Sequence, residues 1–222
     1  MTGRSGTTRV RARRMTPERR REQLVDVTLR LLREHGMGVT TRQIAEAAGI
    51  AEGTIFRVVE TKEELVDAAI MRAFEPRALV ERLQEIDGGQ PLRDRLLVMV
   101  SVLQQRFRAT FFLMQKVGLV RPPQHLHDSA EADAWRAEQH RLMVAVVGSD
   151  ADRLRVPVDQ FCHTLRLLTF AGSHQTIADG HLLSPEEIVD TALYGLLDAS
   201  GSDSDTHTAP ALDATAHAKV DS

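Results

Sequence analysis

Apolar side chains recur every three or four residues along most of the chain, which is the spacing of one face of an α-helix. The first such stripe runs from Leu24 to Leu31, and a longer one runs from Leu96 to Met114. No segment alternates for long between apolar and polar residues, as a half-buried β-strand does. The pattern therefore predicts an all-α fold.

Capping residues and chain breakers divide this pattern into separate helices. Thr16-Pro17-Glu18 combines a capping hydroxyl, a proline at the first helical position and an acid at the positive end of the helix dipole. Pro76 ends or bends a helix, and the glycines and proline of 87–91 are typical of a loop. The predicted helices cover residues 16–35, 40–48, 51–58, 63–74, a long segment through 96–114, 129–147, 157–177 and 184–198.

The stretch from Thr40 to Lys62 predicts two short helices joined by a tight turn, the geometry of a helix-turn-helix. Thr40 and Gln43 have the spacing of a capping box, in which each side chain bonds the other residue's amide. Gly49 suits the left-handed conformation that commonly ends a helix. Ile55 is expected to point inward from the second helix. Thr61 and Glu64 have the spacing of a second capping box.

Gly53 is an unusual residue for the second helix. A glycine early in a helix costs about 0.5–1 kcal/mol relative to alanine. Close approach of the backbone to a partner surface would explain its presence. The residues expected to face mostly outward from this helix are Glu52, Gly53, Thr54, Phe56 and Arg57.

The segment GIAEGTIFRVVETKEEL resembles the recognition-helix signature of the tetracycline-repressor (TetR/AcrR) family of transcriptional regulators. The resemblance continues backward to Leu24-Val25-Asp26 and covers roughly residues 19–69. Two positions depart from the usual pattern: Val59 replaces a phenylalanine, and Ala51 replaces a capping serine or threonine. The first change thins the small core, and the second costs about 1 kcal/mol of helix-start stability.

The resemblance implies an N-terminal three-helix DNA-binding domain and a C-terminal helical domain for ligand binding and dimerisation. It implies that Thr54 and Phe56 touch sugar–phosphate, and that Arg57 contacts a base edge or, as readily, another phosphate. Arg42 and Lys62 begin helices, where side chain, amides and dipole can all meet a phosphate. The predicted DNA-binding residues are Thr40, Arg42, Gly53, Thr54, Phe56, Arg57 and Lys62.

Charge is distributed unevenly along the 222 residues. The first 60 residues hold twelve arginines, no lysine and seven carboxylates, a net charge of +5, whereas the whole chain carries −3 and the remainder therefore −8. This asymmetry favours an N-terminal part that meets phosphate. A single cysteine, Cys162, excludes an internal disulfide and suits a reducing cytoplasm. We expect neither a membrane-spanning stretch nor a signal peptide, and hence a cytoplasmic protein.

The composition also suggests a domain division. Residues 1–15 are polar and arginine-rich and are expected to be disordered. They are either a solubilising tail or an arm that lies along a phosphate backbone or enters a minor groove. The predicted helix-turn-helix domain covers 16–62, the ligand-binding and dimerisation domain covers 63–199, and a polar tail expected to be disordered covers 200–222.

The last two predicted helices carry apolar groups on more than one face, which suits burial on two sides. Relatives in the family pair these helices with their copies in a four-helix dimer bundle. Two such protomers would place two recognition helices in successive major grooves about 34 Å apart, on a near-palindromic operator. The alternative is that the helices close the core of a monomer.

Methionine and aromatic residues on the middle helices suggest a pocket for an apolar ligand, because such side chains make adaptable walls. Such a stripe at helical spacing is more often plain core, and the family resemblance favours the pocket. The predicted ligand-binding residues are Met99, Phe107, Phe111, Met114, Trp135, Met143 and His163.

The sequence offers no support for catalysis or a cofactor: it has no Ser-His-Asp elbow, glycine-rich phosphate loop or His-Glu-x-x-His motif. The segment His125-Leu126-His127-Asp128 lacks the paired spacing of a zinc site and is interpreted as a solvated loop. The sequence therefore predicts a homodimeric repressor released by a small apolar or amphipathic molecule. The alternatives are an activator and a regulator whose C-terminal domain binds a protein partner.

Overall fold

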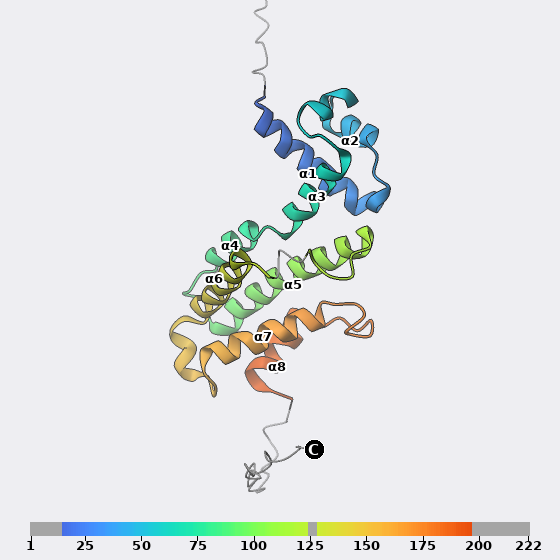
Figure 1. Ribbon diagram of the computed structural model, residues 1–222. Coiled ribbons are helices and arrows are strands. Elements are labelled where there is room, and N and C mark those ends of the chain that lie inside the picture. The colour runs from blue at the N-terminus through green and yellow to red at the C-terminus, as the bar shows by residue number, and fades with distance from the viewer. Residues whose placement is uncertain (1–14, 124–127, 197–222) are drawn as a thin grey trace, which may run out of the picture.

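The computed structural model describes residues 15–123 and 128–196, and these residues form helices and connecting turns without any strand. Figure 1 shows two groups of helices, which we call the head (α1 to α3) and the body (α4 to α8). The predicted all-α fold is confirmed. The α-helices are α1 Pro17–His35, α2 Thr41–Ala48, α3 Lys62–Phe74, α4 Arg77–Gln84, α5 Leu92–Val117, α6 Ala130–Val147, α7 Val158–Gly172 and α8 Pro185–Tyr194, and the 3-10 helices are η1 Gly36–Gly38, η2 Glu52–Arg57 and η4 Gly148–Arg153.

The capping signals in the sequence mark most helix starts correctly. The Thr16 hydroxyl accepts the Arg19 amide at 3.3 Å, and a full capping box closes the start of α8 at Ser184. At Thr61 only half of the predicted box forms. The Thr61 hydroxyl accepts the Glu64 amide at 3.1 Å, but the Glu64 carboxylate accepts the Glu60 amide instead, at 2.9 Å.

Three predicted helices differ from the observed ones. The segment expected as an α-helix over 51–58 is the 3-10 helix η2. The helix expected to reach residue 177 ends at Gly172, where an added Cβ would lie 3.0 Å from the Leu183 side chain, because the chain folds back onto α7 at this point. The last helix ends at Tyr194, and Gly195 follows with a φ of 79° that an α-helix cannot continue.

The head is built on α1, whose apolar side chains face both α2 and α3. Leu24, Leu32, Ile44, Ile55 and Leu65 are fully buried in one cluster, which also includes Val59. The apolar face of α3 belongs to this cluster, so α3 packs with the head, although the sequence analysis divides the domains at 62/63. That division stays a prediction for the function of the two parts.

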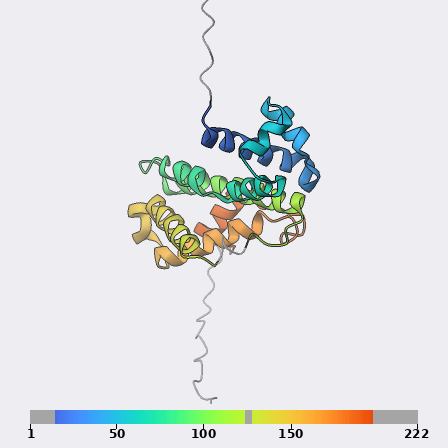
Figure 2. The same cartoon turned by 45° about the horizontal axis from the view of Figure 1, so that its top comes forward.

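The head also packs directly on the body, through the C-terminal end of α5. Leu113 and Val117 of α5 are buried in the head cluster. Figure 2 shows α5 lying between α1 of the head and α7 of the body, in agreement with the contacts of α5 to both helices. The junction therefore has a packed interface in addition to the covalent connection through α3.

The centre of the body is α5, which contacts α4, α6, α7 and α8. By length and composition, α5 alone among the described helices could cross a membrane, whereas the sequence is expected to contain no membrane-spanning stretch. Five α-helices of the same chain, α1 of the head among them, pack against α5. Met99, Leu103, Met143 and Leu165 are fully buried in the body cluster.

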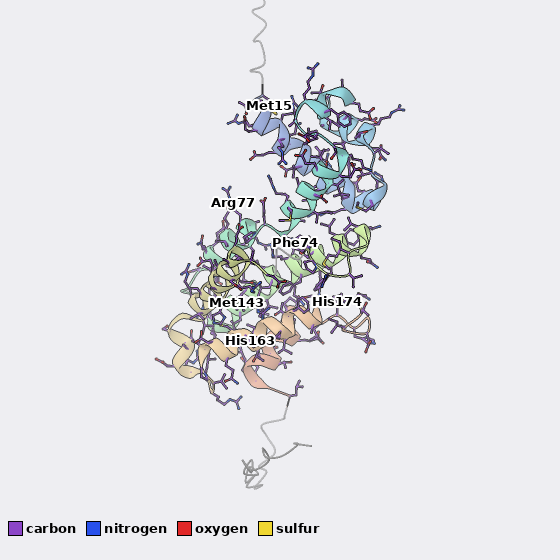
Figure 3. The ribbon with its side chains drawn as sticks, viewed as in Figure 1. Met15, Phe74, Arg77, Met143, His163 and His174 are labelled. Carbon is purple, nitrogen blue, oxygen red and sulfur yellow. The ribbon has the colours of Figure 1, made fainter. Side chains whose placement is uncertain are left out.

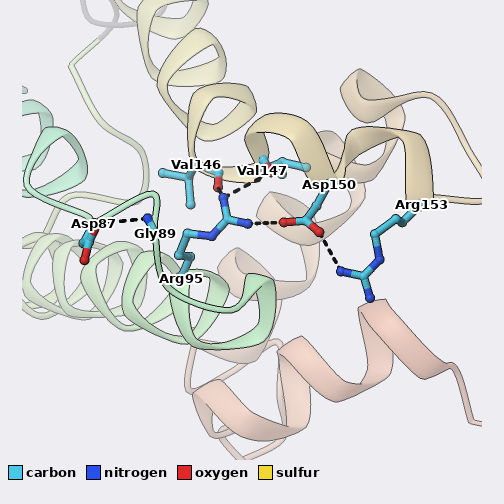
Figure 4. Close-up of polar contacts among 7 residues, drawn as sticks. All are labelled: Asp87, Gly89, Arg95, Val146, Val147, Asp150 and Arg153. Atoms are coloured by element: carbon cyan, nitrogen blue, oxygen red, sulfur yellow. Dashed lines mark hydrogen bonds and ion pairs between the residues drawn. The ribbon is translucent and has the colours of Figure 1, made fainter.

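Arg95 joins three parts of the body in its interior (Figure 4). Its side chain is only 4% exposed. One nitrogen donates to the carbonyl oxygens of Val146 and Val147 at the C-terminal end of α6, the latter at 3.2 Å, and another contacts the Asp150 carboxylate in η4. Arg153 also bonds Asp150, and these guanidinium groups, Arg153 first, lower the pKa of that carboxyl. Arg95 thus satisfies carbonyls that a helix end leaves without partners.

Candidate DNA-binding site

The helix-turn-helix lies in the head as α2, a turn at Gly49 and η2. Thr40 and Gln43 form the complete capping box at the start of α2, with the Thr40 amide donating to the Gln43 side chain at 2.8 Å. Gly49 has φ 67° and ψ 37°, and its amide bonds the carbonyls of Ala45 and Glu46. The capping box and the left-handed glycine are therefore confirmed.

The 3-10 geometry of η2 orders its side chains differently from an α-helix. The Thr54 amide bonds the Ala51 carbonyl at 2.8 Å, and the Val58 amide bonds the Ile55 carbonyl at 2.9 Å. Because side chains three residues apart eclipse in a 3-10 helix, Thr54 and Arg57 share one row and Gly53 and Phe56 share another. Ile55 is fully buried and anchors η2 to the head, so both rows face away from the core.

Gly53 has free space beside its Cα. An added Cβ would find no heavy atom within 4 Å, and its φ does not lie in the left-handed region. Neither the backbone nor the packing of the head therefore requires a glycine at this position. A surface that approaches η2 from outside would require one, because any larger side chain would keep the backbone away from it.

The remaining predicted DNA-binding residues lie around this turn. Arg42 is exposed in the first turn of α2, and Phe56 is half exposed. The Lys62 ammonium donates to the Val39 carbonyl at 3.3 Å, which uses one of its three donors and ties the start of α3 to the residue before Thr40. The seven predicted residues lie at the start of α2, on η2 and at the start of α3, and their DNA contacts stay predictions.

The contact between Thr41 and Glu52 positions η2 and is not predicted from the sequence. The Thr41 hydroxyl bonds the Glu52 carboxylate, which connects the first turn of α2 with the first turn of η2. The methyl group of Ala51 cannot accept a hydrogen bond and so cannot cap η2. The bond between Thr41 and Glu52 connects the start of η2 to α2 instead. The pair is separated by eleven positions and has no local signature.

Glu64 connects the turn after η2 with α1. Its carboxylate accepts the Glu60 amide at 2.9 Å and pairs with Arg21 at 3.0 Å. The amide first, and then the guanidinium, lower the pKa of Glu64. This ion pair fixes α3 against α1 on the side of the head where η2 ends.

The predicted ligand-binding residues lie in different surroundings within the body. Phe107 and Phe111 stack with ring centroids 6.2 Å apart, and each meets the edge of Phe170 from α7. Trp135 and Met114 are half-buried. Met99 and Met143 are fully buried in the core, whereas His163 is exposed on α7 (Figure 3). The structure thus gathers the phenylalanines but places His163 outside, and ligand binding stays a prediction for the set.

A half-open cleft of about 490 Å³ lies elsewhere in the body, at the N-terminal end of α5. None of the seven predicted ligand residues lines it. Its walls are partly apolar, with Phe161, Leu193 and Tyr194, and they also carry three guanidinium groups and one carboxylate. Two of the guanidinium groups are already paired with carboxylates, Arg93 with Asp190 and Arg153 with Asp150. The charged residues are Arg93, Arg153, Arg155 and Asp150.

The histidine segment considered for a metal falls largely outside the described residues, which omit His125 and His127. Within 15–123 and 128–196, no three histidine, cysteine, aspartate or glutamate side chains gather in the manner of a metal site.

The comparisons with known proteins address the same part of the chain. The geometry of α2, Gly49 and η2 defines a helix-turn-helix protein, and residues 24–69 match the family model described as bacterial regulatory proteins, tetR family. The HTH-type transcriptional repressor KstR2 of Rhodococcus jostii (strain RHA1) is 43% identical over 56 residues, which are 25% of this chain and 27% of that protein. The head is thus a TetR-family domain, and the predicted resemblance is confirmed.

The fold of most of the chain also has a solved counterpart. A tetR-family transcriptional regulator from Streptomyces coelicolor superposes with a TM-score of 0.52 at 23% identity, over 80% of this chain and 78% of that one. At this identity the match shows a shared fold of head and body. The chain matches only about a quarter of the length of KstR2.

Proposed function

We propose that this protein is a cytoplasmic, homodimeric transcriptional repressor that binds a near-palindromic DNA operator through its head. The observation that carries the proposal is η2, whose two outward rows combine a hydroxyl, an arginine, an exposed aromatic ring and a glycine with open space. Such a surface suits close approach to a duplex backbone with one side chain free for a base edge. The net charge of +5 in the first 60 residues supports the same partner.

A repressor of this type needs two heads, and the body offers a surface for association. Apolar side chains remain exposed on α7 and beyond it: Leu167 is 47% exposed and Ile177 is 56% exposed. Large apolar groups gathered on one face commonly mark a protein interface. A two-fold contact through α7 and α8 would present two copies of η2 to successive major grooves.

Release of the operator is proposed to follow binding of a small molecule in the body. Two places could hold it, and they differ in chemistry. The stacked rings of Phe107 and Phe111 suit a neutral apolar ligand, whereas the arginine-lined cleft suits an amphipathic anion. Extraction of ligands from purified protein, followed by mass spectrometry, would distinguish the two by the charge of the molecule recovered.

DNA binding is tested by selecting duplexes from fragments of the source genome and measuring affinity against salt concentration. Each phosphate contact should contribute about 0.9 to the negative slope of log affinity against log salt. Arg57→Ala should weaken binding to the selected duplex, and it should relax preference at one position if Arg57 reads a base. Arg77→Ala is the matched control, because Arg77 is exposed on α4 of the body and pairs only with Glu81. Failure to select any duplex would refute the proposal.

A protein partner for the body and a role as activator are the alternatives. A partner protein recovered with the body, together with the absence of any extracted small molecule, would favour the first. Increased transcription from a promoter carrying the selected duplex would favour the second.

A further inference from the structure

Arg106 of α5 lies at the junction between head and body. Two of its nitrogens donate to consecutive backbone carbonyls at the C-terminal end of α3, to Phe74 at 2.7 Å and to Glu75 at 2.9 Å. Figure 3 shows Phe74 where the head meets the body. The last carbonyls of a helix have no partners within that helix, and Pro76 follows with no amide to offer. Arg106 therefore caps α3 from a different helix.

The same guanidinium group reaches the body on its other side. Its central carbon lies 6.0 Å from the centre of the Trp135 ring on α6, within the range of a cation–π contact. Among the described residues Arg106 has no carboxylate partner, and burial lowers the pKa of its guanidinium. A cation in this environment depends on the two carbonyls and the aromatic ring, so a shift of either should move Arg106 as well.

The contacts continue from the end of α3 into the head. The carboxylate of Glu75 pairs with Arg72 at 3.0 Å, and Arg72 also pairs with Asp26 of α1 at 3.1 Å. Polar contacts thus run without interruption from Trp135 on α6, through Arg106, to the end of α3 and then to α1. These residues lie on four different helices.

We propose that Arg106 is a positioning residue that couples the surroundings of Trp135 to the position of the head. This inference rests on the proposed function, since movement of the head is what would release DNA. A ligand that displaces Trp135 would withdraw Arg106 from the carbonyls of Phe74 and Glu75, and the end of α3 would be free to tilt. Coupling of this kind is reciprocal, so a change in the position of the head must also change the surroundings of Trp135.

Trp135 is the only tryptophan in the chain, so its fluorescence reports this one position. The first experiment needs no DNA and compares acrylamide quenching of Trp135 in four proteins: the unaltered chain, Arg72→Ala, Arg106→Ala and the double variant. Loss of Arg72 should change the quenching while Arg106 is present, and it should have no further effect once Arg106 is removed. A role of Arg106 in stability alone would give additive effects.

Arg108→Ala is the matched control. Arg108 lies on the same helix two residues away, is exposed, and donates to the Leu183 carbonyl at 3.3 Å without contacting α3 or Trp135. In an Arg108→Ala background, Arg72→Ala should still change the quenching. If Arg106→Ala does not fold, Arg106→Lys takes its place: it keeps the charge but cannot span both carbonyls, and the response should fall to less than half.

The second experiment adds the selected duplex and follows Trp135 emission at saturation. In the unaltered protein the emission should change, although Trp135 belongs to the body, and in Arg106→Ala the change should shrink by about fivefold or more while the duplex still binds. An equal emission change in both proteins, or an equal effect of Arg72→Ala with and without Arg106, would overturn the inference. Failure to bind duplex would instead refute the proposed function, and the quenching result would still decide the role of Arg106.

Discussion

Gly36 of η1 lies directly against the backbone carbonyl of Lys116 on α5: a Cβ added to Gly36 would stand 2.4 Å from that oxygen. The φ of Gly36 is 60°, in the region that side chains other than glycine's rarely adopt. The backbone of α5 in the body therefore occupies the place where a side chain of Gly36 in the head would lie, and there is no room for a methyl group. This close contact explains why the C-terminal end of α5 can share the apolar cluster of the head.

Gly36→Ala should separate the head from α5 and destabilise the protein. Overpacking of this kind costs about 1–3 kcal/mol, to which the strained φ adds. Urea unfolding should show the loss as a lower midpoint. Gly38→Ala is the control, because Gly38 has open space and no positive φ, and its midpoint should stay the same or rise. Equal midpoints for the two variants would show that the contact at Gly36 is not tight.

Arg95→Ala should destabilise the body far more than Arg93→Ala. Removing Arg95 leaves two carbonyls without their buried donor, at about 1–3 kcal/mol for each unsatisfied group, and it leaves Asp150 paired with Arg153 alone. Arg93 forms a bidentate ion pair with Asp190, but both side chains are more than a third exposed, so water screens the pair and its loss should cost much less than the loss of Arg95. Urea unfolding of both variants measures the difference, and similar losses would contradict this account.

The Asp150 carboxyl also gives this cluster a pH dependence. Its pKa is lowered in the folded protein, so its contribution to stability is present above the ordinary pKa of the group and is lost as the pH falls through the lowered value. Arg95→Ala removes one of the groups that lower this pKa. The difference in unfolding free energy between the parent and Arg95→Ala should therefore narrow in acid.

Cys162 should be unreactive in the native protein. It is buried on α7, and burial raises the pKa of its thiol from 9.0 to about 11. At pH 8 only about 0.1% of the thiol would be ionised, and the thiolate is the reactive form. Alkylation by iodoacetamide at pH 8 should be slow in buffer and fast in urea, and it should report a single site because the chain has one cysteine. Rapid native labelling would contradict the burial of Cys162.

The same raised pKa has a consequence for stability. The folded protein binds the thiol proton more tightly than the unfolded chain does, so this group stabilises the fold below its ordinary pKa. The stabilisation is lost as the pH rises through the pKa of the folded state. The contribution of Cys162 should therefore disappear between pH 9 and about 11. Cys162→Ala should show no such loss in that interval.

Leu167→Asp should convert the proposed dimer to a folded monomer. Leu167 is exposed on α7, so the substitution should leave the protomer stable and should place a charge in the proposed interface. Leu193 is a less suitable site, because it packs partly against the body core. Light scattering gives the mass, and Val120→Asp is the control, since Val120 is 98% exposed after α5 and should leave the dimer intact. A dimeric Leu167→Asp variant would move the interface elsewhere.

The sequence predicts those parts of the structure that depend on neighbouring residues. Thr16, Thr40 and Ser184 each cap a helix through an amide three residues away, and such signals are visible in any short window. The left-handed turn at Gly49 is also predictable locally, because glycine favours this conformation at the end of a helix. For this reason the sequence predicts the helix-turn-helix together with its capping box and its turn.

Other features depend on residues that are far apart in the sequence. Arg95 contacts carbonyls 51 and 52 positions away, and Arg106 reaches back 31 and 32 positions. Both arginines lie on the amphipathic helix α5, and in the sequence alone a buried arginine at such a position cannot be distinguished from a solvent-exposed one. The contact between Thr41 and Glu52 likewise joins two elements, α2 and η2, and has no local signature in the sequence.

Gly53 gives the most direct test of the central claim that η2 meets DNA. Because an added Cβ meets nothing within 4 Å, Gly53→Gln should leave the unfolding free energy within about 0.5 kcal/mol of the parent. The larger side chain should hold the backbone away from the duplex, and affinity for the selected duplex should fall by about tenfold or more, equivalent to about 1.4 kcal/mol. Gly88→Gln, in the open loop before α5, should change neither quantity. A stable Gly53→Gln protein that binds the duplex as tightly as the parent would contradict the claim.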